Sequence, residues 1–336
     1  MKVTVIGSGA WGTTLCGVAA DAGSEVTLVA RNPTVLGSLR DERRHPFSVP
    51  GYRLPDAVRV VPSVTEGLAA SPDLVVMVVP SSAVEAAAGE VEEVGYRGLV
   101  VTATKGIDPG SLKTPAARVA AVRGIGSPVA VLSGPNLAGE VASGLPAAAV
   151  IAAESEEVAS SARSALMSSR FRIYTSRDVT GVEIAGAFKN VIAIGAGISD
   201  GLDAGQNAKA AYVTRGIAEM ARLGLACGAD VMTFAGLAGI GDLMATCNSE
   251  RSRNHTVGRG LAAGRSLGSV LADLKEVAEG VQTTRAVLDL AKVKGVELPI
   301  ASQIARILFE GVSPQIAIAD LMARDATSEM AFLEGF

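Results

Sequence analysis

The chain of 336 residues is long enough for two domains of ordinary size, each with its own hydrophobic core. Apolar residues make up 49% and charged residues 19%, which is typical of a globular protein and excludes a disordered one. The formal net charge of −4 provides no basic surface for nucleic acid, so we expect no nucleic-acid partner.

The cysteines and the N-terminal residues bear on where the protein works. Cys16, Cys227 and Cys247 lack metal-ligand spacing, so we expect no disulfide framework, no bound metal and a cytoplasmic location. Residues 3–20 carry no charge, but they include several glycines and hydroxyl residues. We therefore expect neither a signal peptide nor membrane insertion.

The first predicted element is a short apolar strand, KVTVIG (residues 2–7), which leads into three glycines and then an amphipathic helix. Gly7, Gly9 and Gly12 form G-x-G-x-x-G, which in this context is typical of a dinucleotide-binding turn rather than of turn geometry alone. Gly7 permits the tight turn, Gly9 lets a pyrophosphate approach the backbone, and Gly12 allows the helix to pack closely on the strand. The helix N-terminus would offer N–H groups to the phosphates.

The second predicted strand, EVTLVA (residues 25–30), is followed directly by Arg31 and has no carboxylate beside its end. An acidic residue at this point commonly binds the ribose 2′-hydroxyl of NAD, whereas a guanidinium suits the 2′-phosphate of NADP. The sequence therefore favours NADPH and leaves NAD open. A solvated arginine at a strand end is the alternative interpretation.

Four further apolar runs predict strands at residues 73–80, 98–104, 128–135 and 147–153. They are continuous rather than alternating, which indicates a parallel sheet with helices on both faces. The basic, proline-dotted stretch DERRHPFSVPGYRLP (residues 41–55) is expected to be a loop or insertion next to the cofactor site. The fold class is therefore α/β over residues 1–178, with a Rossmann-like parallel sheet.

Helical patterns dominate after Asp178, with loops expected at GLAGIGDLMATCNSERSRN (residues 236–254) and near Pro299 and Pro314. Residues 179–336 are therefore predicted to form an all-α domain that supplies the substrate site.

Lys189 is the only charged residue between Ile184 and Ser199, in a helix that is otherwise nearly all apolar. A buried lysine is costly unless it is paired or needed for chemistry, which makes Lys189 a candidate proton donor. On this reasoning, replacement by methionine should relieve a costly burial. A structural lysine that reaches the surface is the alternative.

Other charged residues suggest a phosphate-bearing substrate. Lys105 follows a strand at the edge of the sheet where α/β proteins bind ligands, and Asp242 lies among glycines and apolar residues. The stretch ERSRNHTVGR (residues 250–259) concentrates positive charge in an acidic protein, although a solvated basic loop would look the same.

Taken in order, these motifs resemble those of the bacterial NAD(P)-dependent glycerol-3-phosphate dehydrogenases. The matching stretches run from Lys2 to about residue 310 and include VIGSGAWGTTL, VVPS, TATKGID, LSGPNLAGEVASGLP, GVEIAGAFKNVIAIGAGISDGL, NAKAAYVTRGIAEM, GLAGIGDLMATC, SRN and EVAEGVQTT. The resemblance implies reversible reduction of dihydroxyacetone phosphate to sn-glycerol 3-phosphate, the precursor of phospholipids. It also implies a Rossmann-like domain, a helical C-terminal domain, a homodimer and NADP or NAD as cofactor, with no metal.

The resemblance further implies roles for individual residues. Lys189 becomes the catalytic proton donor and acceptor at the substrate C2 oxygen. The implied substrate-binding residues are Lys105, Gly134, Asn136, Lys189, Asp242, Arg253 and Asn254. The implied cofactor-binding residues are Gly7, Gly9, Ala10, Trp11, Gly12, Arg31, Lys105, Ala138, Arg253, Val277 and Glu279.

Departures from the family pattern keep other functions open. Asn136 stands where many bacterial members have Ser or Thr, and Ala10 stands where a serine is common. A paralogue acting on a related small phosphorylated or phosphonate ketone is one alternative. A β-hydroxyacid dehydrogenase would share the two-domain plan but lacks the TKG, GDL and SRN motifs together. A non-enzymatic NADPH-binding sensor is the third, and it would predict a degenerate substrate site.

Overall fold

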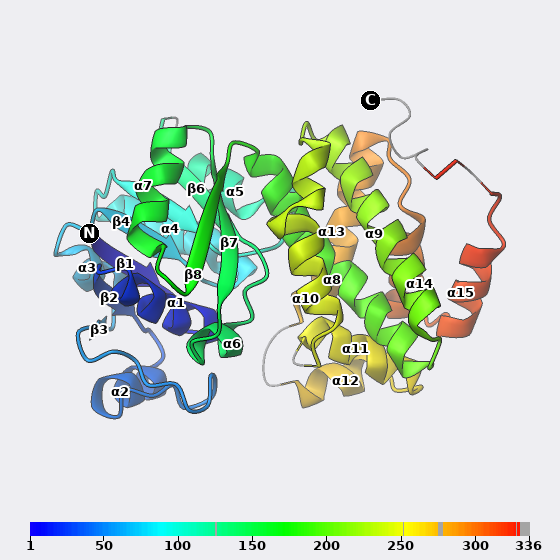
Figure 1. Cartoon of the computed structure of the whole chain (residues 1–336), viewed down its shortest axis with the longest axis horizontal. Coiled ribbons are helices and arrows are strands. Elements are labelled where there is room, and N and C mark those ends of the chain that lie inside the picture. Colours follow the sequence, from blue (N-terminus) through cyan, green and yellow to red (C-terminus); the bar gives the residue numbers. More distant parts are fainter. Residues whose placement is uncertain (125, 251, 275–277, 327, 330–336) are drawn as a thin grey trace. The chain divides into compact units, whose positions relative to one another are not determined.

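A computed structural model of the chain describes residues 1–124, 126–250, 252–274, 278–326 and 328–329 (Figure 1). The chain folds as two compact units. Unit 1 comprises Met1–Lys105 and Thr114–Val179, and unit 2 comprises Gly106–Lys113 and Thr180–Phe336. Residues 106–113, which lie within the range 1–178 assigned above to the first domain, therefore belong with unit 2.

Unit 1 is built on a mixed sheet that contains eight strands among the described residues, in the order β3-β2-β1-β4-β5-β6-β7-β8. The strands are β1 (Lys2–Ile6), β2 (Glu25–Val29), β3 (Arg59–Val61), β4 (Leu74–Met77), β5 (Leu99–Thr102), β6 (Val129–Ser133), β7 (Ala147–Ala153) and β8 (Phe171–Ser176). Neighbouring strands run parallel except β6 and β7, which are antiparallel. The predicted Rossmann-like fold is confirmed, with all six expected strands in it.

Two strands and one strand direction were not foreseen. β3 is only three residues long, and β8 alternates between buried and exposed side chains at its start, so neither has a continuous apolar run. The antiparallel pairing of β6 with β7 depends on how the chain returns to the sheet, which local sequence does not encode.

Helices cover both faces of the sheet, as continuous apolar strands require. Those of unit 1 are α1 (Ala10–Asp21), α2 (Pro33–Asp41), α3 (Val64–Leu68), α4 (Val84–Glu93), α5 (Pro115–Arg123), α6 (Ala138–Ala142) and α7 (Glu156–Leu166), with a short 3-10 turn at Ser81–Ala83. Buried side chains of α1, α2 and α7 form one core with one face of the sheet. Those of α3, α4 and α5 form a second core on the other face.

Residues 42–58, between α2 and β3, form a largely irregular loop, here called the α2–β3 loop, as predicted for most of this stretch. It is tied to itself by Arg43, whose guanidinium donates hydrogen bonds to the carbonyl oxygens of Pro55 and Val58. The Leu54 N–H donates to the Arg43 carbonyl at 2.7 Å. The loop is thus held in a defined conformation.

Unit 2 is helical in its described part, which confirms the all-α prediction. Its helices are α8 (Val179–Gly201), α9 (Gln206–Ala226), α10 (Asp242–Cys247), α11 (Arg253–Ala262), α12 (Leu267–Asp273), α13 (Glu279–Lys294), α14 (Pro299–Phe309) and α15 (Pro314–Met322). A 3-10 segment, Val231–Ala235, and a π-helical turn, Leu237–Gly241, precede α10. The prediction of a loop at residues 236–254 is therefore wrong for most of that range.

The glycines that suggested a loop there serve close packing instead. A Cβ on Gly239 would lie 2.1 Å from the carbonyl oxygen of Phe234, so only glycine fits. The same device joins α8 to α11: a Cβ on Gly197 would lie 2.1 Å from the His255 carbonyl oxygen, and one on Gly258 would lie 1.9 Å from that of Ile194. The two helices therefore touch backbone to backbone, which positions the residues that they carry.

α8 is long and apolar enough to cross a membrane by length and composition, but its most apolar 18-residue stretch is wholly buried within the protein. A helix in the core of a protein can also be this long and apolar, and the burial of α8 is typical of such a core helix.

Candidate active site

The glycine turn after β1 has the geometry that a dinucleotide requires. Gly7 has φ +116°, and a Cβ on Gly12 would lie 1.9 Å from the Gly7 carbonyl oxygen, so turn and helix pack too tightly for any side chain. Gly9 is the N-cap of α1, and no atom of the described residues lies within 4 Å of the position where its Cβ would be. The missing Cβ of Gly9 therefore leaves space beside the N-terminus of α1, and these residues fit a pyrophosphate.

The first turn of α1 contains two more of the expected cofactor residues. Ala10 is the first helical residue, and half-buried Trp11 packs against Phe171 with ring centroids 6.2 Å apart. Thr14 donates hydrogen bonds to the carbonyl oxygens of Ala10 (2.8 Å) and Ala138 (3.4 Å). Ala138, the first residue of α6, is thus tied to the glycine-rich end of α1.

Arg31 is exposed just beyond the end of β2 and forms an ion pair with Glu90 of α4, with 2.9 Å between the guanidinium and the carboxylate. Sequence reasoning considered only residues near Arg31 in the chain and did not foresee this carboxylate. Glu90 both orients the arginine and competes with any 2′-phosphate for it.

Lys105 and the segment after β6 lie together in unit 1. The Lys105 ammonium donates to the Gly134 carbonyl oxygen at 3.4 Å. Gly134 has φ +136°, and a Cβ there would lie 3.0 Å from the Ala149 Cα, so this turn requires glycine. The Asn136 side-chain amide has its NH2 group toward two carbonyl oxygens, and it donates to that of Ala148 at 3.2 Å.

A buried polar cluster in unit 2 surrounds Lys189 and includes Asp242 and Thr246 from α10. Lys189 is 7% exposed and Asp242 is 2% exposed. The Lys189 Nζ donates to the Asp242 carboxylate and, at 2.9 Å, to the Thr246 hydroxyl. That hydroxyl donates in turn to the Asp242 carbonyl oxygen at 2.7 Å. The lysine does not reach for the surface, because its charge is paired inside the helical unit.

A second polar cluster adjoins the first through Asn190, the residue after Lys189. The buried Asn254 amide donates to the Asn190 side-chain oxygen at 3.0 Å, and the Gly280 N–H donates to the Asn254 side-chain oxygen at 3.0 Å. These bonds join α8, α11 and the start of α13. Arg253, the first residue of α11, is exposed beside them.

Two expected cofactor residues remain. Glu279 is half-buried and begins α13, directly before Gly280. Val277 lies outside the described residues, so its assignment stays a prediction.

Two residues of the clusters, Thr246 and Asn190, escaped the sequence reasoning. Thr246 follows Asp242 by four residues, a spacing that places two helical side chains on one face. Neither Thr246 nor Asn190 is charged, so neither stood out in the sequence. The four-residue spacing from Asp242 to Thr246 becomes informative only once residues 242–247 are known to be helical.

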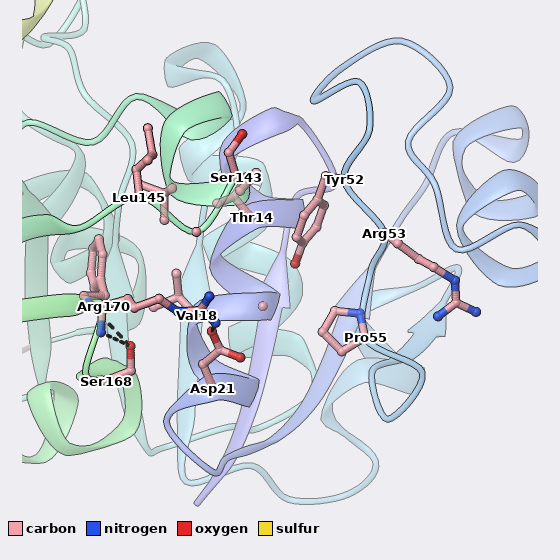
Figure 2. Close-up of a pocket in the computed structure, with 15 residues that line it drawn as sticks. Thr14, Val18, Asp21, Tyr52, Arg53, Pro55, Ser143, Leu145, Ser168 and Arg170 are labelled. Atoms are coloured by element: carbon pink, nitrogen blue, oxygen red, sulfur yellow. Dashed lines mark hydrogen bonds and ion pairs between the residues drawn. The ribbon is translucent and has the colours of Figure 1, made fainter.

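Unit 1 has a separate pocket of about 290 Å³, lined by α1, α6, the α2–β3 loop and the residues leading into β8. Figure 2 shows the side chains around it. Its charged residues are already paired: Arg170 with Asp21 at 2.8 Å, and Arg53, which points away from the pocket, with Asp56 at 2.8 Å. None of the predicted site residues lines this pocket. It is therefore not the candidate active site.

The comparisons with known proteins match the chain to two family models. Residues 2–159 match the N-terminal model of NAD-dependent glycerol-3-phosphate dehydrogenase, and residues 178–319 match the C-terminal model. The chain is 43% identical over 331 residues to glycerol-3-phosphate dehydrogenase (NAD(P)+) of Streptomyces griseus, covering 98% of both chains. It is 44% identical over 336 residues to that of Chlorobium limicola, covering 98% of this chain and 100% of the relative.

Among solved structures, the glycerol-3-phosphate dehydrogenase of Coxiella burnetii superimposes with a TM-score of 0.90 and 34% identity, covering 96% of this chain and 99% of that one. With both family models matched and close relatives aligned over nearly the whole length, the chain belongs to the NAD-dependent glycerol-3-phosphate dehydrogenase family.

Proposed function

We propose that the chain reduces dihydroxyacetone phosphate reversibly to sn-glycerol 3-phosphate, using NADPH or NADH. The observation that carries the proposal is the buried Lys189 ammonium, held by Asp242 and Thr246 in a member of this family. The reaction named for its relatives needs a proton at the carbonyl oxygen when the ketone is reduced. A positioned ammonium is suited to donate that proton and to take it back in the reverse direction.

The dinucleotide supplies the hydride when it is bound, and the chain's own residues do the rest. The turn at Gly7, Gly9 and Gly12 binds the pyrophosphate through the N–H groups at the start of α1. Asp242 pairs with the Lys189 ammonium, and the Thr246 hydroxyl fixes the direction of its Nζ. Lys189 then delivers a proton to the C2 oxygen of the substrate.

The substrate phosphate is assigned to Arg253, with Asn254 beside it. Asn254 donates a hydrogen bond to α8 and accepts one from α13, which holds this corner of α11 in place, so that Arg253 extends from a rigid base. Lys105 and Asn136 in unit 1, together with Gly134, are proposed to bind the substrate as well. Further cofactor contacts are assigned to Ala10, Trp11, Ala138 and Glu279, and Lys105 and Arg253 are proposed to contact the cofactor as well as the substrate.

NADPH is the proposed preferred cofactor, because Arg31 is a cation at the end of β2 with no acidic neighbour in the adjacent sequence. Glu90 weakens this argument without reversing it, because a surface ion pair is worth little and an incoming phosphate can displace the carboxylate. We further propose a cytoplasmic homodimer that supplies sn-glycerol 3-phosphate for phospholipid synthesis.

A panel of small ketones tests the proposal directly. Purified protein is assayed for NADPH consumption with dihydroxyacetone phosphate, unphosphorylated dihydroxyacetone and related phosphorylated or phosphonate ketones, and compared by kcat/KM. We expect dihydroxyacetone phosphate to be the best substrate. A better phosphonate or a different phosphorylated ketone would establish the paralogue alternative. NADPH binding without turnover of any ketone would establish the sensor alternative.

A further inference from the structure

His45 of the α2–β3 loop contacts the dinucleotide turn, and no role has been assigned to it. The imidazole Nε2 of His45 lies 2.8 Å from the carbonyl oxygen of Ser8, the residue between Gly7 and Gly9. His45 is half-buried, and it is separated from Ser8 by α1, β2 and α2 along the chain. The contact is therefore tertiary, and the G-x-G-x-x-G pattern alone does not predict it.

The partners of the imidazole determine which of its nitrogens carries the proton. Nδ1 lies 3.1 Å from the Phe47 N–H and 3.0 Å from the Ser48 N–H, and both of these groups can only donate. Nδ1 must therefore accept, and Nε2 must donate to the Ser8 carbonyl oxygen, which can only accept. We assign the neutral Nε2–H tautomer. In this form one ring ties the backbone of the loop to the backbone of the turn.

Holding the Ser8 carbonyl also orients the next N–H group. A trans peptide is planar, with its C=O and N–H pointing in opposite directions, so the Ser8 oxygen and the Gly9 N–H move as one unit. The oxygen is held by His45 and, more weakly, by the Thr13 hydroxyl at 3.3 Å. The shorter of the two bonds comes from His45. Gly9 itself has open space around the position of its missing Cβ, where a phosphate would approach.

We propose that His45 is a positioning residue for the cofactor: by holding the Ser8 carbonyl, it fixes the Gly9 N–H in the direction that binds the pyrophosphate. This inference rests on the proposed function only for the identity of the ligand. The Arg43 hydrogen bonds make the loop a fixed base for the histidine. Without His45 the Ser8 oxygen keeps the weaker bond from Thr13, so the Ser8–Gly9 peptide is less firmly held and its ordering opposes cofactor binding.

Two substitutions separate the two ends of this bridge. In His45→Asn the side-chain oxygen stands close to Cβ as Nδ1 does, so it can still accept from the Phe47 and Ser48 N–H groups but cannot reach Ser8. In His45→Gln the amide nitrogen stands about as far from the backbone as Nε2 does, so it can still donate to Ser8. Arg53→Gln is the matched control, because Arg53 lies in the same loop and pairs only with Asp56 among the contacts described above.

The readouts are the Kd for NADPH from cofactor fluorescence without substrate, the KM and kcat values, and the Tm. We expect His45→Asn to raise the Kd and the KM for NADPH roughly threefold to tenfold, the effect of losing one hydrogen bond. kcat at saturating cofactor and the KM for dihydroxyacetone phosphate should stay within about twofold of wild type. His45→Gln should recover most of the affinity, and Arg53→Gln should match wild type.

An unchanged NADPH Kd in His45→Asn would overturn the proposal. So would a loss of affinity in His45→Gln as large as in His45→Asn, since that would assign the effect to the loop turn. These results differ from a failure of the proposed function, in which wild-type protein binds NADPH but does not reduce dihydroxyacetone phosphate. The Kd comparison is valid in either case.

Discussion

Replacing Lys189 by methionine should destabilise the protein, because it leaves the Asp242 carboxylate buried without its ammonium partner. Asp242 is 2% exposed, and the Thr246 hydroxyl that also lies near its carboxylate carries no charge to replace the ammonium. Breaking a buried ion pair by removing one partner typically costs about 3–5 kcal/mol. From the sequence alone, the same substitution was expected to relieve a costly burial. The pairing reverses the sign of that expectation.

The double variant Lys189→Met/Asp242→Asn tests the reasoning. It removes both charges while keeping the volume of both side chains, so most of the lost stability should return. The free energy of unfolding is measured by urea denaturation for wild type, both single variants and the double variant. Arg265→Met, which breaks the exposed ion pair with Asp273, is the control and should cost at most about 1 kcal/mol.

Turnover separates the role of the charge in folding from its role in catalysis. Both variants that lack Lys189 should lose about 10²–10⁴-fold in kcat, the range for a positioned general acid, while still binding NADPH. The double variant is then stable but inactive. If Lys189→Met were as stable as wild type, or the double variant no more stable than Lys189→Met, the buried-pair argument would be wrong. Near-normal turnover would transfer the proton-donor role to another residue, with Lys105 the first candidate.

Three further results are expected. Arg253→Ala should mainly raise the KM for dihydroxyacetone phosphate, and the fall in kcat/KM should correspond to a loss of about 2–4 kcal/mol in transition-state stabilisation. The poor activity on unphosphorylated dihydroxyacetone should stay almost unchanged, and equal losses on both substrates would make Arg253 structural. Arg31→Asp should lower kcat/KM with NADPH about tenfold or more, and kcat/KM with NADH far less. Glu90→Gln should strengthen NADPH binding by at most about fivefold. Equal effects on both cofactors would contradict recognition of the 2′-phosphate by Arg31. Burial raises the pKa of Glu219 to about 7, although its carboxylate accepts two N–H groups at the start of α14. The folded state therefore binds the Glu219 proton more tightly than the unfolded chain does. The contribution of the protonated Glu219 to the free energy of unfolding is complete below about pH 4.5 and is lost as the pH rises to about 7. Urea denaturation across this range should show a smaller decline for Glu219→Gln, and an identical decline would refute the assignment.

Local sequence determined those features that depend on neighbours along the chain. Continuous apolar runs predicted six strands and the cover on both faces of the sheet, because a strand buried on both sides has no polar face to show. The spacing of Gly7, Gly9 and Gly12 predicted the dinucleotide turn, and at Gly7 and Gly12 the backbone packs too closely for a side chain. Lys189 stood out because a lone charge in an apolar helix needs a reason to be there.

Only the tertiary structure decided which groups meet. Asp242 and Thr246 reach Lys189 across more than fifty positions of the chain, and His45 reaches Ser8 across thirty-seven. The glycines of residues 236–241 looked like a loop because glycine permits turns and close backbone packing alike, and the sequence does not say which applies. Pairing partners, strand direction and helix crossings depend on the surfaces that the folded chain brings together, and these are set by distant residues rather than by the local pattern.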